Sequence, residues 1–585
     1  MQKLMRGARA HWVFLCVLGA YAVSAFMVPT LAPVSVSDDP LYARSVEILV
    51  RQGNFRILPI SVASTVSQVW WGALFTTVFP DTLGVLRVGT VCVTFIGAIA
   101  VYALCRELGV TQTRSALGAA LFLFHPLSYV LGFTFMTDAY LTSFIAIAVF
   151  CFARGLRDGV LNLRWLAAGS AASGLAFLVR QQGVLVPVAL VLYLVVSRRL
   201  RFDAASARIV AAVLAVPVIT AGAYWAWFNY LHGTSKSAQV SVASGLGDAG
   251  ASELSLLARR LLFIMVVYSA FLMLPLIAAA LVRVPEFVRS MTRAGWIFVG
   301  VWIVVLVTGP VFSEFLRHAR MPYLAQFVSV SGLGPPGDVR GGRVPFFGPT
   351  PRYWFTVLCV VASVVLAIAF ARRMPALAQR SESPAAMVAA VLLVQIAGVI
   401  FTSIPLRGTA ISRDRYLLPL LPLFIALTLW ALNRVRIALW AGWTVVGAMA
   451  AVSVAGTHDY LSYQNTVWSV ARRAHAEGVP YRSLDAGAAW DAYHLYEESY
   501  KQNAHVDLTK LKGFKPGTHF YLSKHDVEPW WIGFYTPIQN NDYVVSSEPL
   551  FTYDTLRRVK YSSWLHRKPQ YIYLVRHAGL KNPPL

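Results

Sequence analysis

The chain has 585 residues, of which 57% are hydrophobic and only 13% are charged, and its formal net charge is +24. A soluble protein of this length cannot bury so much apolar side chain, so the composition excludes an ordinary soluble fold. Apolar runs of about 20 residues recur, each long enough to cross a bilayer as a helix, whereas strands of a membrane barrel are about half as long. The composition therefore predicts a polytopic α-helical membrane protein with the lipid bilayer as its solvent.

The positive charge is concentrated in short connections between the apolar runs. Arginine and lysine favour such connections on the cytoplasmic side of a membrane, so we predict no nucleic-acid partner. A cytoplasmic N-terminus and thirteen spans place these connections inside and the C-terminus outside, in the plasma (inner) membrane. The predicted spans are residues 12–33, 84–105, 115–132, 138–153, 165–180, 183–197, 209–230, 260–282, 295–313, 353–371, 385–404, 416–432 and 437–455.

The composition divides the chain near residue 455, where the apolar runs stop. We predict a transmembrane domain over residues 1–455, with outer loops at 34–83 and 314–352, and an extracytoplasmic mixed α/β domain over 456–585. Within the first loop, the apolar segment 57–79 is interrupted by proline and polar residues, which predicts a helix along the outer surface or a re-entrant helix. Strand-like pieces of the C-terminal domain occur at 481–487, 518–524 and 569–575.

Two acids, Asp38 and Asp39, follow the first apolar run. Proline suits the first position of a helix and aspartate suits the N-cap, which predicts an amphipathic surface helix from Pro40 to Gly53 with Asp39 as its cap. Asp38 is then left to project towards the membrane edge. The same topology brings Asp138, which opens the fourth span, to the same outer boundary.

Paired carboxylates at this boundary suit two kinds of chemistry. One of them can act as a general base towards a hydroxyl group, or Asp38 and Asp138 can hold a divalent cation through their oxygens. The alternative is that both acids serve only as helix caps, and the residues leave metal dependence open.

Three arginines, Arg180, Arg413 and Arg415, are expected at the same boundary. Arginine is costly there and usually has a partner, and its planar guanidinium matches the oxygens of a phosphate. Arg180 is the first candidate for a phosphate ligand. For Arg413 and Arg415, contact with lipid headgroups is an equal alternative.

Four motifs in chain order resemble the GT-C superfamily of integral membrane glycosyltransferases. The similar branch comprises the protein O-mannosyltransferases, the lipid A aminoarabinose transferases and the RgtA/B/C/D-like enzymes. Three departures are Asp39 for the commoner Glu, Arg180 for Lys, and a long loop at 329–349 without a counterpart. The motifs are Ser37-Asp38-Asp39-Pro40-Leu41-Tyr42-Ala43, Thr137-Asp138-Ala139-Tyr140-Leu141, Phe177-Leu178-Val179-Arg180-Gln181-Gln182-Gly183 and Arg415-Tyr416-Leu417-Leu418-Pro419.

The resemblance implies an inverting glycosyltransferase that uses a polyprenyl-phosphate-linked sugar and an acceptor hydroxyl on an envelope glycan, lipid or protein. Asp38, with Asp39 beside it, lies at the catalytic position, and Asp38 is the implied general base. Asp138 is implied to orient the acceptor or to contribute to a metal site, and Arg180 to bind the donor phosphate with Arg415 or Arg413. The resemblance implies no certain cofactor, and it leaves open whether Asp38 and Asp138 hold a divalent cation.

Two other classes of function remain open from the residues. A transporter or flippase for a lipid-linked glycan is expected to carry ionisable residues near the bilayer midplane and often has repeated halves, whereas the charges here gather at the outer boundary. The other alternative is a non-catalytic membrane subunit.

Overall fold

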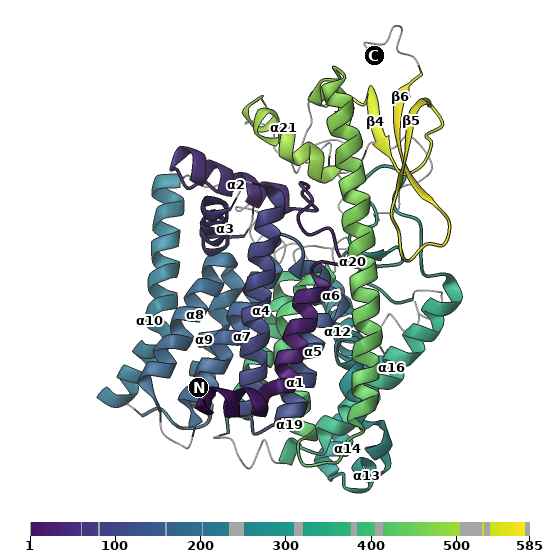
Figure 1. The fold of residues 1–585 in the computed structure, drawn as a ribbon. Helices are drawn as coiled ribbons and strands as arrows, with labels where there is room; N and C mark the ends of the chain where they lie inside the picture. The colour runs from purple at the N-terminus through teal and green to yellow at the C-terminus, as the bar shows by residue number, and fades with distance from the viewer. Residues whose placement is uncertain are drawn as a thin grey trace.

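The structure, a computed structural model, is a bundle of long apolar helices with a smaller strand-containing region at one end (Figure 1). It describes residues 2–59, 61, 63–79, 82–157, 161–201, 203–232, 251–308, 320–375, 383–403, 413–502, 529, 531 and 539–578. The α-helices are α1 (Gln2–Ser24), α2 (Asp39–Gln52), α3 (Val66–Val78), α4 (Leu83–Glu107), α5 (Gln112–Phe124), α6 (Pro126–Gly132), α7 (Thr137–Gly155), α8 (Leu163–Val179), α9 (Leu185–Val196), α10 (Ala204–Ala226), α12 (Ala251–Ala280), α13 (Val284–Arg289), α14 (Arg293–Thr308), α16 (Pro349–Ala371), α18 (Pro384–Ser403), α19 (Leu421–Leu432), α20 (Leu439–Ala476) and α21 (Ala488–Gln502). The strands are β1 (Val328–Ser329), β2 (Gly332–Leu333), β3 (Leu484–Asp485), β4 (Tyr543–Ser546), β5 (Tyr553–Tyr561) and β6 (Gln570–His577).

The helices confirm the predicted class of protein but not the predicted count of spans. Among the described residues, 8 helices are long and apolar enough to cross a membrane, or 9 if α5 and α6, bent by 60°, form one span. Shorter apolar helices occupy the other four predicted spans, at His11–Ser24, Leu163–Val179, Gln181–Val196 and Arg293–Thr308. A helix therefore lies within each predicted span, whereas thirteen crossings are not confirmed.

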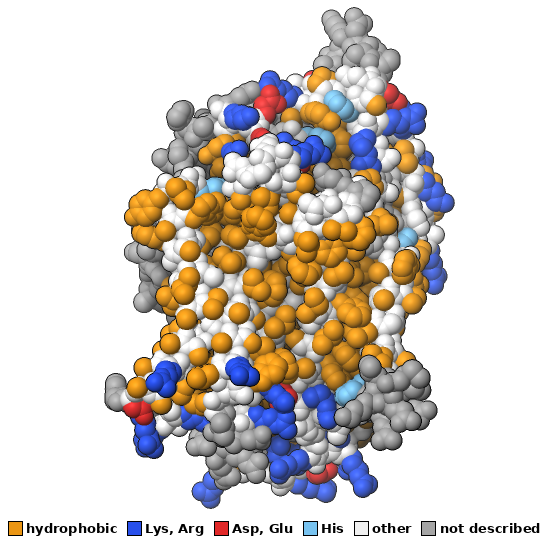
Figure 2. Space-filling model, turned by 60° about the vertical axis from the view of Figure 1, so that its left-hand side comes forward, with side chains coloured by type: hydrophobic (Ala, Val, Ile, Leu, Met, Phe, Trp, Pro, Cys, Tyr) orange, Lys and Arg blue, Asp and Glu red, His pale blue; other side chains and the backbone are white. Residues whose placement is uncertain are grey.

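A belt of hydrophobic side chains surrounds the bundle on the face that Figure 2 shows, between charged side chains at its two ends. Exposed apolar residues of α9 and α10, such as Val196 and Ile219, contribute to this surface. Apolar side chains exposed in this number are expected where lipid replaces water as the solvent.

The long helix α20 connects the bundle to the strand-containing region. It packs on α5, α6 and α12 within the bundle and on β4, β5 and β6 beyond it (Figure 1). The predicted domain boundary at 455/456 therefore falls inside α20. The four-stranded sheet has the order β3-β4-β6-β5, in which β3 and β4 are parallel and the other pairs antiparallel.

The strand-containing region is mixed α/β, as the sequence predicts, because α21 accompanies this sheet. The predicted piece 569–575 lies almost entirely within β6, and 481–487 contains β3. The third piece, 518–524, lies outside the described residues, as do residues 314–319 of the second outer loop.

The first predicted outer loop covers the end of the bundle at which α2 lies. Figure 1 shows α2 lying across this end, with α3 beneath it, and α2 contacts α3 and α21. The helix ends at Gly53, as predicted, because Gly53 adopts a left-handed φ of 64° and its N–H donates to the carbonyl of Leu49. Within the apolar segment 57–79, α3 has 13 residues, which are too few to cross a bilayer.

A buried arginine fixes the chain between α1 and α2. Arg87 of α4 is 1% exposed, and its guanidinium donates hydrogen bonds to the carbonyls of Thr30 and Ala32, at 3.0 and 2.7 Å, and of Val34. Its charge also interacts with the carboxylate of Asp39. One buried side chain thus satisfies three backbone carbonyls and offsets part of the cost of burying Asp39.

Asp39 is a buried structural acid, and the prediction that it caps a helix from Pro40 is wrong. The helix begins at Asp39 itself, and the Asp39 carboxylate turns back to accept hydrogen bonds from the N–H of Val36, at 2.6 Å, and the hydroxyl of Ser35. The N–H of Phe135 also donates to it, at 3.3 Å. Burial raises the pKa of Asp39 to about 6, although Arg87 and these hydrogen bonds oppose the rise.

Replacement of Arg87 tests this arrangement. Arg87→Leu is expected to lower the free energy of unfolding by about 3–5 kcal/mol, because the variant leaves a buried carboxylate without its cation. Thermal unfolding of the purified protein in detergent measures the loss. The control is Arg51→Leu on α2, whose side chain is 63% exposed, with an expected change within about 0.5 kcal/mol. Equal unfolding temperatures for the two variants would contradict the proposed role of Arg87.

Candidate active site

Two carboxylate–arginine clusters meet at the α2 end of the bundle. The first contains Asp38, the N-cap residue of α2, whose Oδ2 lies 2.7 Å from Nη2 of Arg415 and 3.4 Å from Nη1 of Arg413. The Arg415 side chain is only 5% exposed, whereas that of Asp38 is 18% exposed. Asp38 is therefore accessible at the edge of the site, and its main cation is buried behind it.

The second cluster is an ion pair between Asp138 and Arg180. Nη1 of Arg180 lies 3.0 Å from Oδ1 of Asp138, which occupies the first turn of α7. The Asp138 side chain is 1% exposed, and within the described part of the chain its Oδ2 has no hydrogen-bond partner. A buried acid that uses one oxygen for an arginine keeps the other for a further ligand.

Arg180 occupies a break between α8 and the 3₁₀ turn Gln181–Val184. Its extended backbone, with φ −150° and ψ 140°, reverses the chain, and the N–H of Gly183 donates to the carbonyl of Arg180 at 2.9 Å. A Cβ on Gly183 would lie 2.3 Å from the backbone nitrogen of Phe177, so the turn requires glycine there. The Arg-Gln-Gln-Gly sequence thus presents the guanidinium at the tip of a tight turn.

The two clusters are joined through aromatic rings. The Cζ atoms of Arg180 and Arg415 lie 4.7 and 5.4 Å from the ring centre of Tyr416. The pKa of Tyr42 is raised by burial first and then by the Asp38 carboxylate, while Arg415 and Arg180 lower it. Both pairs therefore act on the same tyrosine of α2 and belong to one site.

The structure brings together five of the six site residues that the sequence indicates: Asp38, Asp138, Arg180, Arg413 and Arg415. Within this group, the ion pair of Arg180 is with Asp138, whereas Arg413 and Arg415 bind Asp38. The sixth, Asp39, lies next in the chain but directs its carboxylate into the loop.

Sequence reasoning missed Asp414, which lies between the two arginines of the first cluster. Its carboxylate is buried and accepts hydrogen bonds from the N–H groups of Phe327, at 3.0 Å, and Val328, at 2.6 Å. Asp414 therefore anchors the long loop after residue 320 while Arg413 and Arg415 bind Asp38. The alternation Arg-Asp-Arg is the sequence signal that could have indicated that the acid and the two arginines have different partners.

Sequence reasoning also missed Asp338, which that loop brings to the site. It is 7% exposed. Burial, and after it the Asp38 carboxylate, raise the pKa of Asp338 to about 7, although Arg413 and Arg415 oppose the rise. The loop has no periodic pattern, so its sequence gave no reason to place Asp338 near Asp38.

The donor set does not fit a bound metal. Asp38 and Asp138 each face an arginine, whereas a divalent cation requires oxygen ligands without competing cations. The residues that the structure describes include no group of three His, Cys, Asp or Glu side chains that could hold a metal ion. We therefore assign no chemical step to a metal at Asp38 and Asp138.

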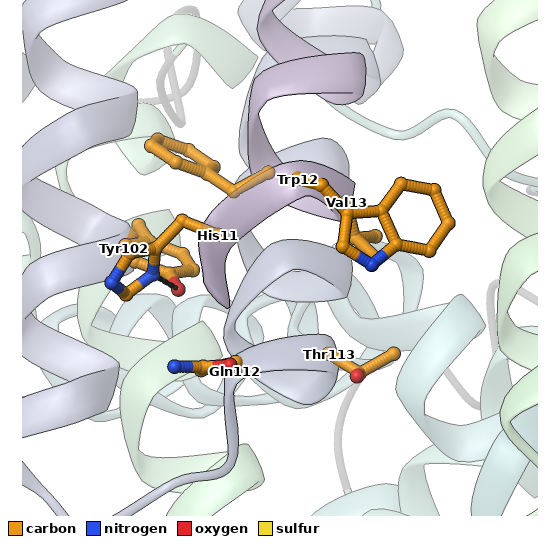
Figure 3. Close-up of a pocket in the computed structure, with 7 residues that line it drawn as sticks. His11, Trp12, Val13, Tyr102, Gln112 and Thr113 are labelled. Atoms are coloured by element: carbon orange, nitrogen blue, oxygen red, sulfur yellow. Dashed lines mark hydrogen bonds between the residues drawn. The ribbon is translucent and has the colours of Figure 1, made fainter. Parts of the chain in front are cut away.

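A separate pocket lies near the N-terminal helix, between α1, α4 and α5 (Figure 3). His11, Trp12, Tyr102, Gln112 and Thr113 contribute to its lining, and Nδ1 of His11 is 2.6 Å from the hydroxyl of Tyr102. These residues belong to the end of the bundle opposite α2 (Figure 1). This pocket is not part of the candidate site.

Comparisons with known proteins concern both the sequence and the fold. Residues 66–225 match the family model described as Dolichyl-phosphate-mannose-protein mannosyltransferase. Comparison with curated proteins finds no match.

Three solved structures illustrate the similarity of fold. The S. cerevisiae protein O-mannosyltransferase complex bound to the sugar donor is 18% identical with a TM-score of 0.33, over 39% of this chain and 35% of that chain. ArnT from Cupriavidus metallidurans bound to undecaprenyl phosphate is 13% identical with a TM-score of 0.41, over 98% and 99%. The oligosaccharyltransferase of Archaeoglobus fulgidus tethered with an acceptor peptide is 14% identical with a TM-score of 0.43, over 91% and 64%.

The chain thus spans 35% of the length of the first of these structures, and the match to the family model covers one continuous segment of this sequence. That segment includes α7 and the Arg180 turn, which contribute one of the two clusters of the site. The match confirms the resemblance to the GT-C superfamily of integral membrane glycosyltransferases that the loop motifs predict.

Proposed function

We propose that this chain is an inverting glycosyltransferase that moves a sugar from a polyprenyl-phosphate donor to an acceptor hydroxyl. The acceptor belongs to an envelope glycan, lipid or protein, and the reaction takes place at the extracytoplasmic face of the inner (plasma) membrane. The main support for this proposal is a cluster of two acids and three arginines at one end of an apolar bundle: Asp38, Asp138, Arg180, Arg413 and Arg415. The family match over residues 66–225 supports the reaction class.

The arginines supply the binding site for the donor phosphate. A guanidinium binds phosphate oxygens with charge-assisted hydrogen bonds, and Arg180 and Arg415 lie on the same tyrosine ring, so one phosphate can contact both. The isoprenoid tail then lies along the apolar helices. Binding competes with the carboxylates that the arginines contact in this structure.

Asp38 is the proposed general base. While Arg415 and Arg413 bind its carboxylate, they stabilise the charged form and make it a weak base. When the donor phosphate takes over these guanidinium groups, Asp38 loses that stabilisation and can accept the proton of the acceptor hydroxyl. Donor binding thereby activates the base.

The reaction is a single displacement. The acceptor oxygen forms a bond to the anomeric carbon as its proton passes to Asp38, and the bond from that carbon to the phosphate oxygen breaks. The bonding electrons leave with the polyprenyl phosphate, whose added charge the arginines stabilise. One displacement without a covalent enzyme intermediate inverts the anomeric configuration. Asp138 is proposed to orient the acceptor through its second oxygen, and the lack of a hydrogen-bond partner for Oδ2 among the described residues supports this role.

A comparison of envelope glycans from cells with and without the protein, by mass spectrometry, identifies the product. Loss of one sugar from one glycan, lipid or protein in cells without the protein is expected. Identical envelope composition in the two strains would contradict the proposal.

Asp38→Asn tests the general base. It is expected to lower transfer of labelled sugar from polyprenyl phosphate by at least about 100-fold, because general-base catalysis contributes at least that factor. The assay uses purified protein in liposomes, with Asp554→Asn as control, since that side chain on β5 is 59% exposed. Unchanged transfer by Asp38→Asn with wild-type behaviour in size-exclusion chromatography would exclude Asp38 as the base.

Binding of undecaprenyl phosphate tests the arginines separately from the chemistry. Arg180→Gln and Arg415→Gln are each expected to weaken binding about 10-fold or more, as for the loss of one hydrogen bond to a charged group. Asp38→Asn is expected to strengthen binding, because the phosphate no longer competes with that carboxylate. Arg473→Gln on α20, with a side chain 67% exposed, is the control. Equal affinities for wild type and both arginine variants would rule out the proposed phosphate site.

A further inference from the structure

Asp338 is a buried acid for which the fold offers no structural purpose. Its side chain is in the buried class, and its Oδ2 has no hydrogen-bond partner among the residues described. An acid buried without a partner costs free energy, and it costs more beside another carboxylate, here that of Asp38. Such a cost in a native structure indicates a ligand or a function.

Three other buried acids, Asp39, Asp414 and Asp459, provide a direct contrast. Asp39 and Asp414 use their oxygens for backbone N–H groups of neighbouring loops. Asp459 of α20 accepts hydrogen bonds from the N–H groups of Trp564 and Leu565, at 2.6 and 3.0 Å. Each of these three acids holds two segments together. By contrast, Oδ2 of Asp338 has no hydrogen-bond partner among the described residues.

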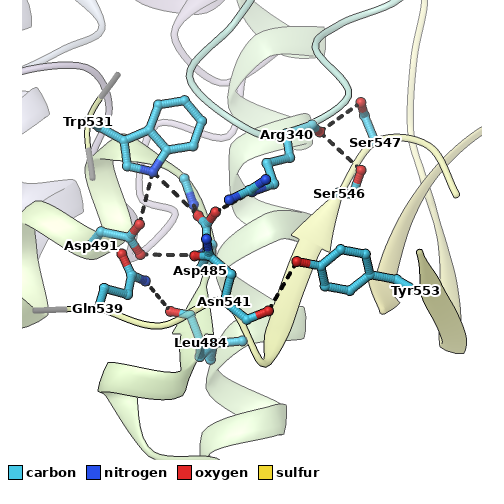
Figure 4. Close-up of polar contacts among 12 residues, drawn as sticks. Arg340, Leu484, Asp485, Asp491, Trp531, Gln539, Asn541, Ser546, Ser547 and Tyr553 are labelled. Atoms are coloured by element: carbon cyan, nitrogen blue, oxygen red, sulfur yellow. Dashed lines mark hydrogen bonds and ion pairs between the residues drawn. The ribbon is translucent and has the colours of Figure 1, made fainter. Parts of the chain in front are cut away.

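The backbone on both sides of Asp338 is nevertheless held firmly. The carbonyl of Asp338 accepts a hydrogen bond from the N–H of Ala488 at the start of α21, at 2.8 Å. Two residues later, Nε of Arg340 lies 2.7 Å from Oδ2 of Asp485 on β3, and the ion pair is buried (Figure 4). The carbonyl of Arg340 accepts from the N–H of Ser547, at 3.0 Å. The C-terminal region thus fixes the position of Asp338 without using its carboxyl group.

The charges around Asp338 indicate what it can bind. The carboxyl interacts electrostatically with Asp38 and with Arg413, Arg415 and Arg343, so it belongs to the same electrostatic site as the proposed base. An ionised carboxylate repels phosphate, whereas the arginines attract it. A carboxyl group does bind hydroxyl groups, as an acceptor when ionised and also as a donor when protonated.

We propose that Oδ2 of Asp338 binds a hydroxyl group of a sugar substrate next to Asp38. This inference rests on the proposed glycosyl transfer and names a residue outside the four motifs of the family resemblance. The hydroxyl belongs either to the transferred sugar or to the acceptor. Both substrates offer the same hydrogen-bonding group, and steady-state kinetics distinguish which of them Asp338 binds.

The test compares Asp338→Ala and Asp338→Asn with wild type in the liposome transfer assay. The labelled donor is titrated at fixed acceptor, and membranes from cells that lack the protein are titrated as the acceptor source. Asp338→Ala is expected to raise KM about 10-fold for one of the two substrates, with kcat changed less than about threefold. Asp338→Asn keeps an oxygen acceptor and an N–H donor, and is expected to restore most of the affinity.

Controls separate binding from misfolding and from failure of the proposed function. Asp338→Ala is expected to bind undecaprenyl phosphate as tightly as wild type, and Asp554→Ala is expected to leave both KM values unchanged. A raised donor KM assigns the hydroxyl to the transferred sugar, and a raised acceptor KM assigns it to the acceptor. Normal KM values in Asp338→Ala with active wild type overturn this inference alone. Absence of transfer by wild type overturns the proposed function and this inference with it.

Discussion

The site depends on one buried cation, Arg87 of α4. Its guanidinium satisfies three carbonyls of the chain between α1 and α2 and faces the carboxylate of Asp39. That chain leads directly into α2, so the orientation of Asp38 at the helix N-cap follows from it. An arginine inside an apolar helix is costly unless its donors are used. In this structure the hydrogen bonds of Arg87 go to the loop between α1 and α2. That loop must be rigid for Asp38 to contact Arg415.

Neighbouring acids divide into structural and chemical ones by where their oxygens point. Asp39 and Asp414 bind backbone N–H groups, and each is adjacent in sequence to a residue of the site: Asp38 in one case, Arg413 and Arg415 in the other. Successive side chains in extended or turn segments point in different directions, so one can anchor the backbone while its neighbour enters the site. Both Asp38-Asp39 and Arg413-Asp414-Arg415 follow this pattern, and the two segments contribute the acid and the arginines of the same cluster.

Hydropathy and charge predict the helices and the site residues better than they predict contacts between them. Apolar length places each helical segment, and motif order brings Asp38, Asp138 and the arginines to one end. The capping preference of Asp39 failed because tertiary hydrogen bonds with Val36 and Phe135 override a local propensity. The partner of Arg180 depended on the turn at Gly183, and Asp338 on a loop whose position the C-terminal region sets. Neither the turn at Gly183 nor the loop that contains Asp338 has a periodic pattern in the sequence.

In the proposed reaction, the ion pairs of this structure act as the resting form of the site. A base that is always exposed beside the arginines could deprotonate hydroxyls without a donor present, whereas Asp38 is stabilised as a weak base by Arg415 and Arg413. The donor phosphate must displace a carboxylate to bind, which weakens its affinity but couples binding to activation. Asp338 strengthens that coupling, because a further carboxyl beside Asp38 disfavours the ionised pair once the arginines turn to the phosphate. In this proposal, competition for three guanidinium groups controls when Asp38 can act as the base.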